Sequence, residues 1–333
     1  MLHKARHNPA RLPDGHPPVL TVVVDTEEEF DWNAPFARAN TGTGSIAAQP
    51  LAHERIYDAL GMVPTYVVDY PVATTPAAYQ VLRRLMEEGR CEIGTHLHPW
   101  VSPPHDEEVN RFNSYTGNLP PALEFAKLQA LTGAIAENFG RAPRVFKAGR
   151  YGLGPQTAQA LATLGYEVDA SVVPRTTFTS DGGPDFSDFD IHPYWFEAGG
   201  RRLLELPVTA GFCGKLRAQG ASLYPALQAP LARTLRLAGI ASRTGLLDRV
   251  RLSPEGFALE DLQRLANTLV RDGCQVLTLT YHSPSLVPGH TPYVRDAAGL
   301  DRFLASIRAL LLHFRQELGG VFMSISQLRD TLR

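Results

Sequence analysis

The sequence has little of what would mark a specialised class of protein. It contains only three cysteines among 333 residues, too few to suggest a disulfide framework. No apolar run approaches the roughly 20 residues of a membrane-spanning helix. A net charge of -2 provides no global field that would attract nucleic acid or an anionic membrane. The remaining composition, 44% hydrophobic and 20% charged, is that of a globular protein with a large core.

The beginning of the sequence also lacks an apolar core. Residues 1–18 are polar and hold four prolines and three histidines, so we expect a flexible N-terminal leader and no secretory signal. Together with the few cysteines, this favours a cytoplasmic protein. We expect residues 19–333 to form a single domain.

What the sequence does have is an alternation of strand-like and helical segments. Residues 19–24, VLTVVV, form an apolar β-branched run typical of a strand buried on both faces. Similar runs at 91–96 and 275–281 alternate with helical patterns such as 76–88. Strands separated by helices in this way indicate βαβ units around a parallel sheet, with about seven strands in all. The sequence therefore predicts an α/β fold.

Two stretches depart from this alternation. Residues 211–252 are rich in Leu, Ala and Arg and predict an insertion with one or two amphipathic helices. The long loop at 99–120 is rich in Pro, Asn and Ser, and loops of this length are often functional. After the insertion, Ser-Pro-Glu at 253–255 has the pattern of a helix N-cap and predicts a helix that runs to Arg271.

Polar side chains gather where the predicted strands end. In parallel α/β folds the carboxyl ends of the strands meet at one edge, where functional groups collect. A single polar strand end is commonly a cap or a solvated rim, but a series of such strand ends indicates a shared site. These residues are Asp25, Glu27, His96, His98, Lys147, Arg150, Asp169, Ser171, Tyr281 and His282.

The spacing of His96 and His98 suits a metal site. Residues two apart on a strand point to the same side, and neutral imidazole is the commonest metal ligand in proteins. Glu27 can add an oxygen ligand, which completes the three protein ligands typical of a catalytic zinc site. The same ligands also suit cobalt, nickel or manganese. The competing interpretation is two polar side chains on an exposed strand face.

Asp25 and His282 have the chemistry of proton-transfer residues. Asp25 lies two residues before Glu27, so its carboxylate can face the same centre and act as a general base, and His282 could protonate a leaving group. Lys147 and Arg150 could orient Asp25 or bind an oxyanion. Each residue also has a structural interpretation, as the acidic first turn of a helix, a hydrogen-bonded histidine at a strand end or a surface charge.

Short motifs follow one another from the first predicted strand to the C-terminus: Asp25-Thr-Glu27, Glu92-Ile-Gly-Thr-His96, Phe146-Lys-Ala-Gly-Arg-Tyr-Gly152, Asp169-Ala-Ser171, Glu205-Leu-Pro, Tyr281-His282-Ser and Phe322-Met-Ser-Ile-Ser. In this order they resemble the motifs of the polysaccharide deacetylase family, also called the NodB-homology or carbohydrate esterase family 4 group. Each motif is short, but the ordered set is specific. The variants EIGTHLHPW and AGRYG are most similar to the WalW-type subgroup of the family.

This resemblance implies a distorted (β/α)7 barrel and a metal-dependent hydrolase that removes acetyl groups from N-acetylated, sometimes O-acetylated, sugars. An acetylated carbohydrate is therefore the expected partner. The motifs match Asp25 to the catalytic base, Glu27 to the carboxylate ligand, His96 to the first histidine ligand and His282 to the catalytic acid. The backbone near Tyr151 would help to hold the oxyanion.

The chain departs from the family pattern at three points. The family usually spaces its two histidines four apart, so His98 as the second ligand is inferred from strand geometry, with His105 as the alternative. Lys147 stands where the family often has an arginine that orients the base. A lysine lacks the bidentate fork, so either Arg150 takes that role or the site is tuned differently. The secretion signal common in the family is absent, which favours a soluble intracellular precursor as substrate.

Three functions fit the sequence. The first is deacetylation of an acetylated amino sugar, oligosaccharide or polysaccharide, with Tyr151, Trp100 and Asp169 binding the substrate and the tryptophan stacking on a sugar face. The second keeps the metal and changes the substrate to a cyclic amide such as allantoin, with the loops at 99–120 and 174–200 shaping a small closed pocket. The third is a non-catalytic carbohydrate-binding barrel, which the unusual lysine and histidine spacing motivate.

Overall fold

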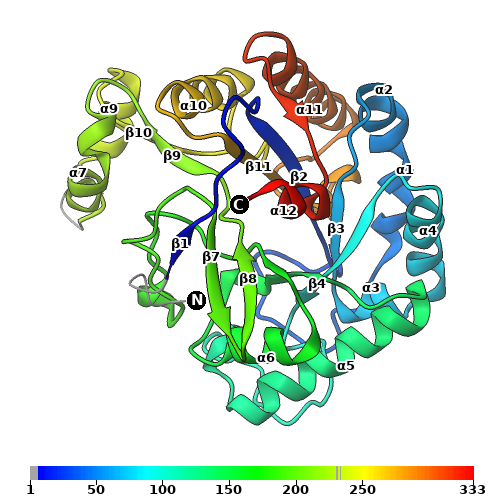
Figure 1. Cartoon of the computed structure of the whole chain (residues 1–333). Coiled ribbons are helices and arrows are strands. Elements are labelled where there is room, and N and C mark those ends of the chain that lie inside the picture. Colours follow the sequence, from blue (N-terminus) through cyan, green and yellow to red (C-terminus); the bar gives the residue numbers. More distant parts are fainter. Residues whose placement is uncertain (1–6, 230–231, 233) are drawn as a thin grey trace.

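A parallel sheet curled into a barrel forms the centre of the protein (Figure 1). The computed structural model describes residues 7–333 except residues 230, 231 and 233. Seven strands follow one another in the order β8-β6-β5-β4-β3-β2-β11, each parallel to its neighbours. These strands are β2 (Val19–Thr26), β3 (Thr65–Val68), β4 (Glu92–Leu97), β5 (Val145–Ala148), β6 (Val168–Asp169), β8 (Arg201–Glu205) and β11 (Val276–His282).

The structure confirms the predicted distorted (β/α)7 barrel. No backbone ladder joins β8 to β11 among the described residues, so the barrel is open along this seam. Other contacts bridge the seam: the Thr278 N–H donates to Thr209 Oγ1 at 2.7 Å, and the Thr280 N–H donates to the Leu252 carbonyl at 3.1 Å. The edge of β11 therefore finds hydrogen-bond partners without a neighbouring strand.

Short strands extend the sheet at its edges. β7 (Tyr194–Ala198) is antiparallel to β8, β1 (Asn8–Pro9) is antiparallel to β7, and β12 (Val321–Phe322) pairs with the start of β2.

Residues 7–12 pack on the barrel, in contrast to the flexible leader that we predicted for residues 1–18. Ala10 and Leu12 are buried in the barrel interior, and the backbones of Arg11 and Arg333 exchange two hydrogen bonds of 3.0 and 3.2 Å. The prediction failed because two apolar side chains in a polar segment suffice to anchor it once a strand edge is available. Residues 1–6 lie outside the described part of the chain.

Helices surround the sheet on its outer face (Figure 1). The helix that we predicted to begin at Ser253 begins instead at Leu259, because Ser253 and Glu255 are buried polar residues of the preceding loop. None of the described helices is long and apolar enough to cross a membrane. The outer helices are α1 (Gln49–Ala52), α2 (Asp58–Leu60), α3 (Tyr70–Thr74), α4 (Pro76–Glu87), α5 (Pro121–Phe139), α6 (Thr157–Leu164), α10 (Leu259–Arg271) and α11 (Ala297–Gln316). The last helix, α12 (Ile325–Thr331), packs on the inner face instead.

The alternation of side chains along each strand separates the core into two parts. In β2, Val24 belongs to the outer cluster that packs against the helices, whereas Val19 and Val23 point into the barrel. There they meet Leu328 of α12, which Figure 1 shows within the ring of strands. Because Asp25 shares the inward face with Val19 and Val23, β2 aims this carboxylate into the barrel at its carboxyl end.

In its described residues, the insertion at 211–252 is a ribbon of two strands that carries the two short helices α7 (Gly220–Leu227) and α9 (Leu237–Arg243). β9 (Ala210–Cys213) and β10 (Asp248–Arg251) pair antiparallel, and the two helices lie between them in sequence. The sequence predicted helices but not the strands, because strands of four residues are too short for a clear period-two signal.

Candidate active site

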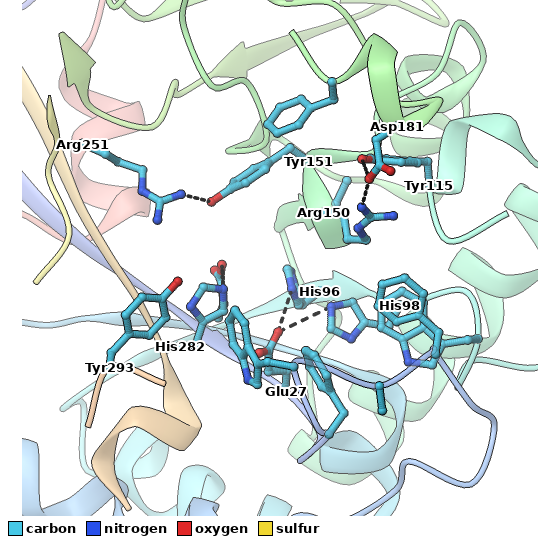
Figure 2. A pocket seen from close by; sticks show the side chains of 18 residues that line it. Glu27, His96, His98, Tyr115, Arg150, Tyr151, Asp181, Arg251, His282 and Tyr293 are labelled. Atoms are coloured by element: carbon cyan, nitrogen blue, oxygen red, sulfur yellow. Dashed lines mark hydrogen bonds and ion pairs between the residues drawn. The ribbon is translucent and has the colours of Figure 1, made fainter. Parts of the chain in front are cut away.

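A cavity of about 340 Å³ opens at the carboxyl ends of the barrel strands (Figure 2). Eight residues that we assigned to catalysis, metal binding or substrate binding line it: Asp25, Glu27, His96, His98, Trp100, Arg150, Tyr151 and His282. Lys147 and Asp169, which we also assigned to the site, do not line it, and neither do Ser171 and Tyr281. Its polar lining consists of Asp25, Glu27, His96, His98, Arg150, Asp181, Arg251 and His282. Its aromatic lining consists of Phe30, Trp32, Phe36, Trp100, Tyr115, Tyr151, Phe178 and Tyr293.

Glu27, His96 and His98 form one buried cluster, close enough together to hold a metal ion. Glu27 Oε2 lies 3.6 Å from His96 Nε2 and 3.5 Å from His98 Nε2. Glu27 comes one residue after β2, and the two histidines lie at the end of β4 and just beyond it. The period-two spacing therefore brings both rings to one point, as strand geometry predicts. His105 is exposed and does not belong to this cluster.

Both histidine rings present an electron pair to Glu27. His96 Nδ1 lies 3.0 Å from the Lys147 carbonyl, and His98 Nδ1 lies 2.7 Å from Glu28 Oε2. Both partners are acceptors, so each ring donates from Nδ1 and leaves Nε2 without a proton. Burial lowers the pKa of both imidazoles, that of His98 to about 4, so the rings stay neutral.

The three residues fit a bound cation. Glu27 Oε1 is buried and has no hydrogen-bond partner among the described residues. Burial and the neighbouring charges of Glu28 and Asp25 raise the pKa of Glu27 well above its usual value. Two nitrogen electron pairs and a carboxylate that face one another repel unless a positive charge lies between them. This is the donor set of a divalent metal with two imidazoles and one carboxylate.

Glu28 and Asp69 form a hydrogen-bonded layer behind His98. Glu28 accepts from His98 Nδ1 and from Trp100 Nε1, each at 2.7 Å, and the Glu28 N–H donates to Asp69 Oδ2 at 2.6 Å. Burial and the charge of Glu28 raise the pKa of Asp69 well above its usual value. Such an outer layer fixes the orientation and tautomer of a ligand histidine.

Trp100 contributes to the same layer. Its ring stacks on His98 with centroids 4.3 Å apart, and only 2% of its surface is exposed. Its contacts therefore position the histidine, although its sequence motif led us to assign it to substrate binding. Sequence reasoning missed Glu28 and Asp69; the available signals were a second acid directly after Glu27 and an acid at the end of β3.

Asp25 is held by Lys147. Lys147 Nζ lies 2.5 and 2.6 Å from the two carboxylate oxygens, and both side chains are buried. Burial acts to raise the pKa of Asp25, but the charge and the hydrogen bonds of Lys147 oppose this, and the pKa falls to about 2. A single ammonium thus contacts both oxygens that an arginine fork would contact. Arg150 points away from Asp25 and pairs with Asp181.

His282 is oriented by Glu255, a residue that sequence reasoning assigned to a helix N-cap. His282 Nδ1 lies 2.7 Å from Glu255 Oε2, and the His282 N–H donates to Glu255 Oε1 at 3.0 Å. Ser285 Oγ also donates to Glu255 Oε1, at 2.6 Å. His282 Nε2 lies 3.7 Å from Asp25 Oδ2, so the free side of the ring faces the cavity beside the carboxylate.

The turn after β5 explains the glycine in its motif. A Cβ added to Gly149 would lie 2.3 Å from His98 Cδ2, so only glycine allows the backbone to pass this ring. Arg150 and Tyr151 follow with φ of 52° and 59°, a conformation that non-glycine residues adopt rarely. The turn directs Tyr151 to the cavity and Arg150 to Asp181 and the Tyr115 ring, whose centroid is 4.1 Å from the guanidinium.

Asp169 lies outside the cavity, although we assigned it to substrate binding. Its side chain is fully buried and accepts a hydrogen bond of 2.5 Å from Ser171 Oγ. That hydroxyl in turn accepts from the Ala148 N–H at 2.7 Å. Asp169 therefore supports the end of β5 from behind. It is the last residue of β6 and lies on the side that faces away from the barrel interior. A strand of two residues gives no pattern from which this side could be predicted.

Solved structures with similar folds include proteins of two activities. A protein from Mycobacterium smegmatis assigned as a polysaccharide deacetylase is 18% identical over 97% of this chain and 92% of its own, with a TM-score of 0.55. One from Pseudomonas aeruginosa PAO1, similarly assigned, is 14% identical over 94% and 90% of the two chains, with a TM-score of 0.53. The allantoinase PuuE is 15% identical over 96% and 91%, with a TM-score of 0.56.

These likenesses show the fold, which the chain shares with assigned deacetylases and with an allantoinase. Comparisons with protein-family models and with curated protein sequences gave no match. The choice between activities therefore depends on the site.

Proposed function

We propose that the protein is a metal-dependent hydrolase of the polysaccharide deacetylase type, which removes the acetyl group from an acetylated amino sugar. The observation that carries this proposal is the convergence of Glu27, His96 and His98 beside Asp25 in one cavity. Glu27, His96 and His98 would hold a divalent metal, for which Zn²⁺ is the most suitable ion. When bound, the metal would polarise the acetyl carbonyl and lower the pKa of water.

Asp25 is the general base in this proposal. Its carboxylate borders the cavity next to the Glu27 cluster and would accept a proton from the attacking water. Lys147 keeps this carboxylate charged and fixes both of its oxygens. Lys147 thus supplies the orientation for which the family often has an arginine, which speaks against the non-catalytic alternative that the lysine had motivated.

His282 is the general acid. Its Nε2 faces the cavity near Asp25, while Glu255 holds its Nδ1. A ring fixed at one nitrogen is well placed to deliver a proton from the other to the departing amine. We assign the backbone near Tyr151 to the oxyanion, since the left-handed turn at 150–151 brings it to the cavity. The aromatic lining provides flat apolar faces for a sugar ring.

Acetate release from purified protein tests the proposal. With Zn²⁺ added, we expect acetate from a panel of N-acetylated sugars, both neutral and anionic, and chelation should stop the release reversibly. Asp25→Asn should remove the activity, whereas Asp31→Asn provides the matched control, because Asp31 is exposed and does not line the cavity. Stoichiometric metal without acetate release from any sugar of the panel would contradict the proposal.

A second candidate is hydrolysis of a small cyclic amide. The loops at 99–120 and 174–200 both wall the cavity, through Tyr115 and Phe178, and its volume of about 340 Å³ suits a compact substrate. The same base, metal ligands and acid would serve a ring amide as well as an acetamide. Loss of allantoin measured beside acetate release separates the two: ring opening without acetate release would favour the second candidate.

A further inference from the structure

Arg251 is a cation without a counter-ion in the wall of the cavity. It is the last residue of β10, and its side chain lines the cavity. Its Nη1 donates to Tyr151 Oη at 3.1 Å, while its Nε is buried and has no hydrogen-bond partner in the described part of the chain. Among the described residues no carboxylate lies within ion-pair distance of it.

The nearby carboxylates are committed to other partners. Asp25 pairs with Lys147, and Glu255 pairs with His282, so both act on Arg251 only from a longer range. A guanidinium carries five N–H donors, and within the described part of the chain Arg251 uses one of them. A half-buried charge left unpaired in this way is unfavourable unless a ligand compensates it.

Two other arginines show how this protein satisfies a structural guanidinium. Arg150 lines the same cavity but pairs with Asp181. Arg249, two residues before Arg251 in β10, donates to the Pro174 carbonyl and to Thr176 Oγ1 and does not line the cavity. Of these three arginines, only Arg251 lines the cavity with a single side-chain hydrogen bond and no carboxylate partner among the described residues.

Tyr151 provides a second donor at the same place. Its hydroxyl oxygen accepts from Arg251, so its own proton remains available to donate. The ring is fixed by stacking on Phe178, with centroids 5.6 Å apart, and by Lys147 Nζ at 5.4 Å from its centroid. Figure 2 shows Arg251 and Tyr151 across the cavity from His282 and Glu27. A substrate held at its acetyl group by the Glu27 side therefore presents its other end to Arg251.

We propose that Arg251 and Tyr151 bind an anionic group of the substrate, and that the substrate is an acetylated amino sugar that carries a carboxylate or a phosphate. Guanidinium forks bind both groups through charge-assisted hydrogen bonds. The amino-sugar part of this inference rests on the proposed function, whereas the anion site rests on Arg251 and Tyr151 alone.

Binding of three probes to the zinc-loaded protein, measured by titration calorimetry, tests the inference. The probes are N-acetylglucosamine, which is neutral, N-acetylmuramic acid, which adds a carboxylate, and N-acetylglucosamine 6-phosphate. We expect at least one anionic probe to bind at least about tenfold more tightly than the neutral one. Whichever of the two anionic probes binds more tightly shows whether the site prefers a carboxylate or a phosphate.

Variants assign the preference to Arg251. Arg251→Gln should remove it, and Arg251→Lys should retain part of it, because a lysine keeps the charge but lacks the fork. Arg249→Gln is the matched control from the same strand and should keep the wild-type preference. Thermal unfolding of each variant separates loss of binding from loss of folding.

Equal affinity of the wild type for neutral and anionic probes would overturn the inference. So would a preference that survives in Arg251→Gln, or a failure to bind either anionic probe. Acetate release in the same samples tests the proposed function separately. An Arg251-dependent preference without acetate release retains the anion site and contradicts the deacetylase. If acetate release does not depend on the charge of the sugar or on Arg251, the proposed deacetylase is retained and the anion site is contradicted.

Discussion

The two ends of the barrel interior are built on the same strands and differ in their chemistry. On β2, β5 and β11 the inward side chains at the amino ends are apolar and share one buried cluster with α12, whereas those at the carboxyl ends are charged or a histidine. The pairs that share a strand are Val19 and Asp25 on β2, Val145 and Lys147 on β5, and Val276 and His282 on β11. On these three strands the inward side chains pack in the core at the start of the strand and lie at the candidate active site at its end.

The difference lies in how each end satisfies its buried groups. At the amino end, Ile325 and Leu328 fill the interior by close packing. At the carboxyl end each charged group needs a partner, and Lys147 provides one for Asp25. Among the described residues, Glu27 Oε1 and Arg251 Nε lack hydrogen-bond partners. Both residues line the cavity, where our proposals place a metal ion and an anionic group of the substrate.

The largest expected effect comes from Asp25→Asn at the polar end. Loss of a general base lowers kcat roughly 10²–10⁴-fold, and the variant should still bind metal because Glu27, His96 and His98 remain. It should also lose roughly 3–5 kcal/mol of stability, since Lys147 is left buried without its partner. Acetate release, metal content and chemical unfolding measure the three effects. A kcat within tenfold of the wild type would contradict the role of Asp25.

A change at the apolar end should alter stability alone. Leu328→Ala removes a fully buried side chain of α12 and should cost about 2–5 kcal/mol. The kcat of the folded fraction should not change, since Leu328 does not reach the cavity. Asp330→Ala on the exposed side of the same helix is the control and should leave the free energy of unfolding within about 0.5 kcal/mol. Loss of kcat in folded Leu328→Ala would show that the two ends are not separate.

Glu255→Gln should have a smaller effect on activity than Asp25→Asn. It keeps the shape of the side chain but removes the charge that holds His282 Nδ1. Loss of such a supporting carboxylate typically costs 10–100-fold in activity. Metal content should stay at the wild-type level, because Glu255 does not belong to the Glu27 cluster. A wild-type kcat in Glu255→Gln would contradict the role of Glu255 in orienting His282.

The smallest expected effect is the pH dependence of that same carboxylate. Burial acts to raise the pKa of Glu255, but His282, Ser285 and the backbone outweigh it and hold the pKa below 4.5. The unfolded chain then binds this proton more readily than the folded protein, so the stability due to ionised Glu255 is present above pH 4.5 and lost as the pH falls through the lowered pKa. Urea unfolding of metal-free wild type and Glu255→Gln should show a stability difference that shrinks on acidification. A stability difference that grows on acidification would contradict a lowered pKa of Glu255.

Much of this comparison could be predicted from the sequence. Which residues of one strand share a face follows from the period-two alternation of side chains. This alternation predicted that His96 and His98 lie together and that Asp25 faces the same centre as Glu27. Strand ends of a parallel sheet meet by topology, which brought His282 to the same cavity. These inferences use only local periodicity and one property of the fold.

The rest depends on contacts between distant segments that no local pattern encodes. Asp69 supports Glu28 from 41 residues away, and Glu255 supports His282 from 27. The direction of Arg150 follows from a left-handed turn at a non-glycine residue, which sequence propensity argues against. Arg251 enters the cavity from a strand that the sequence did not predict.

The proposed function depends most on metal binding by Glu27, His96 and His98, and anomalous diffraction at the zinc edge tests this binding most directly. Crystals grown with Zn²⁺ should show one strong peak per chain among the Glu27 carboxylate, His96 Nε2 and His98 Nε2. The peak should disappear in His98→Ala and persist in His105→Ala. No peak at this position, or a peak among Glu28, Asp69 and His98, the second buried group close enough to hold an ion, would contradict it.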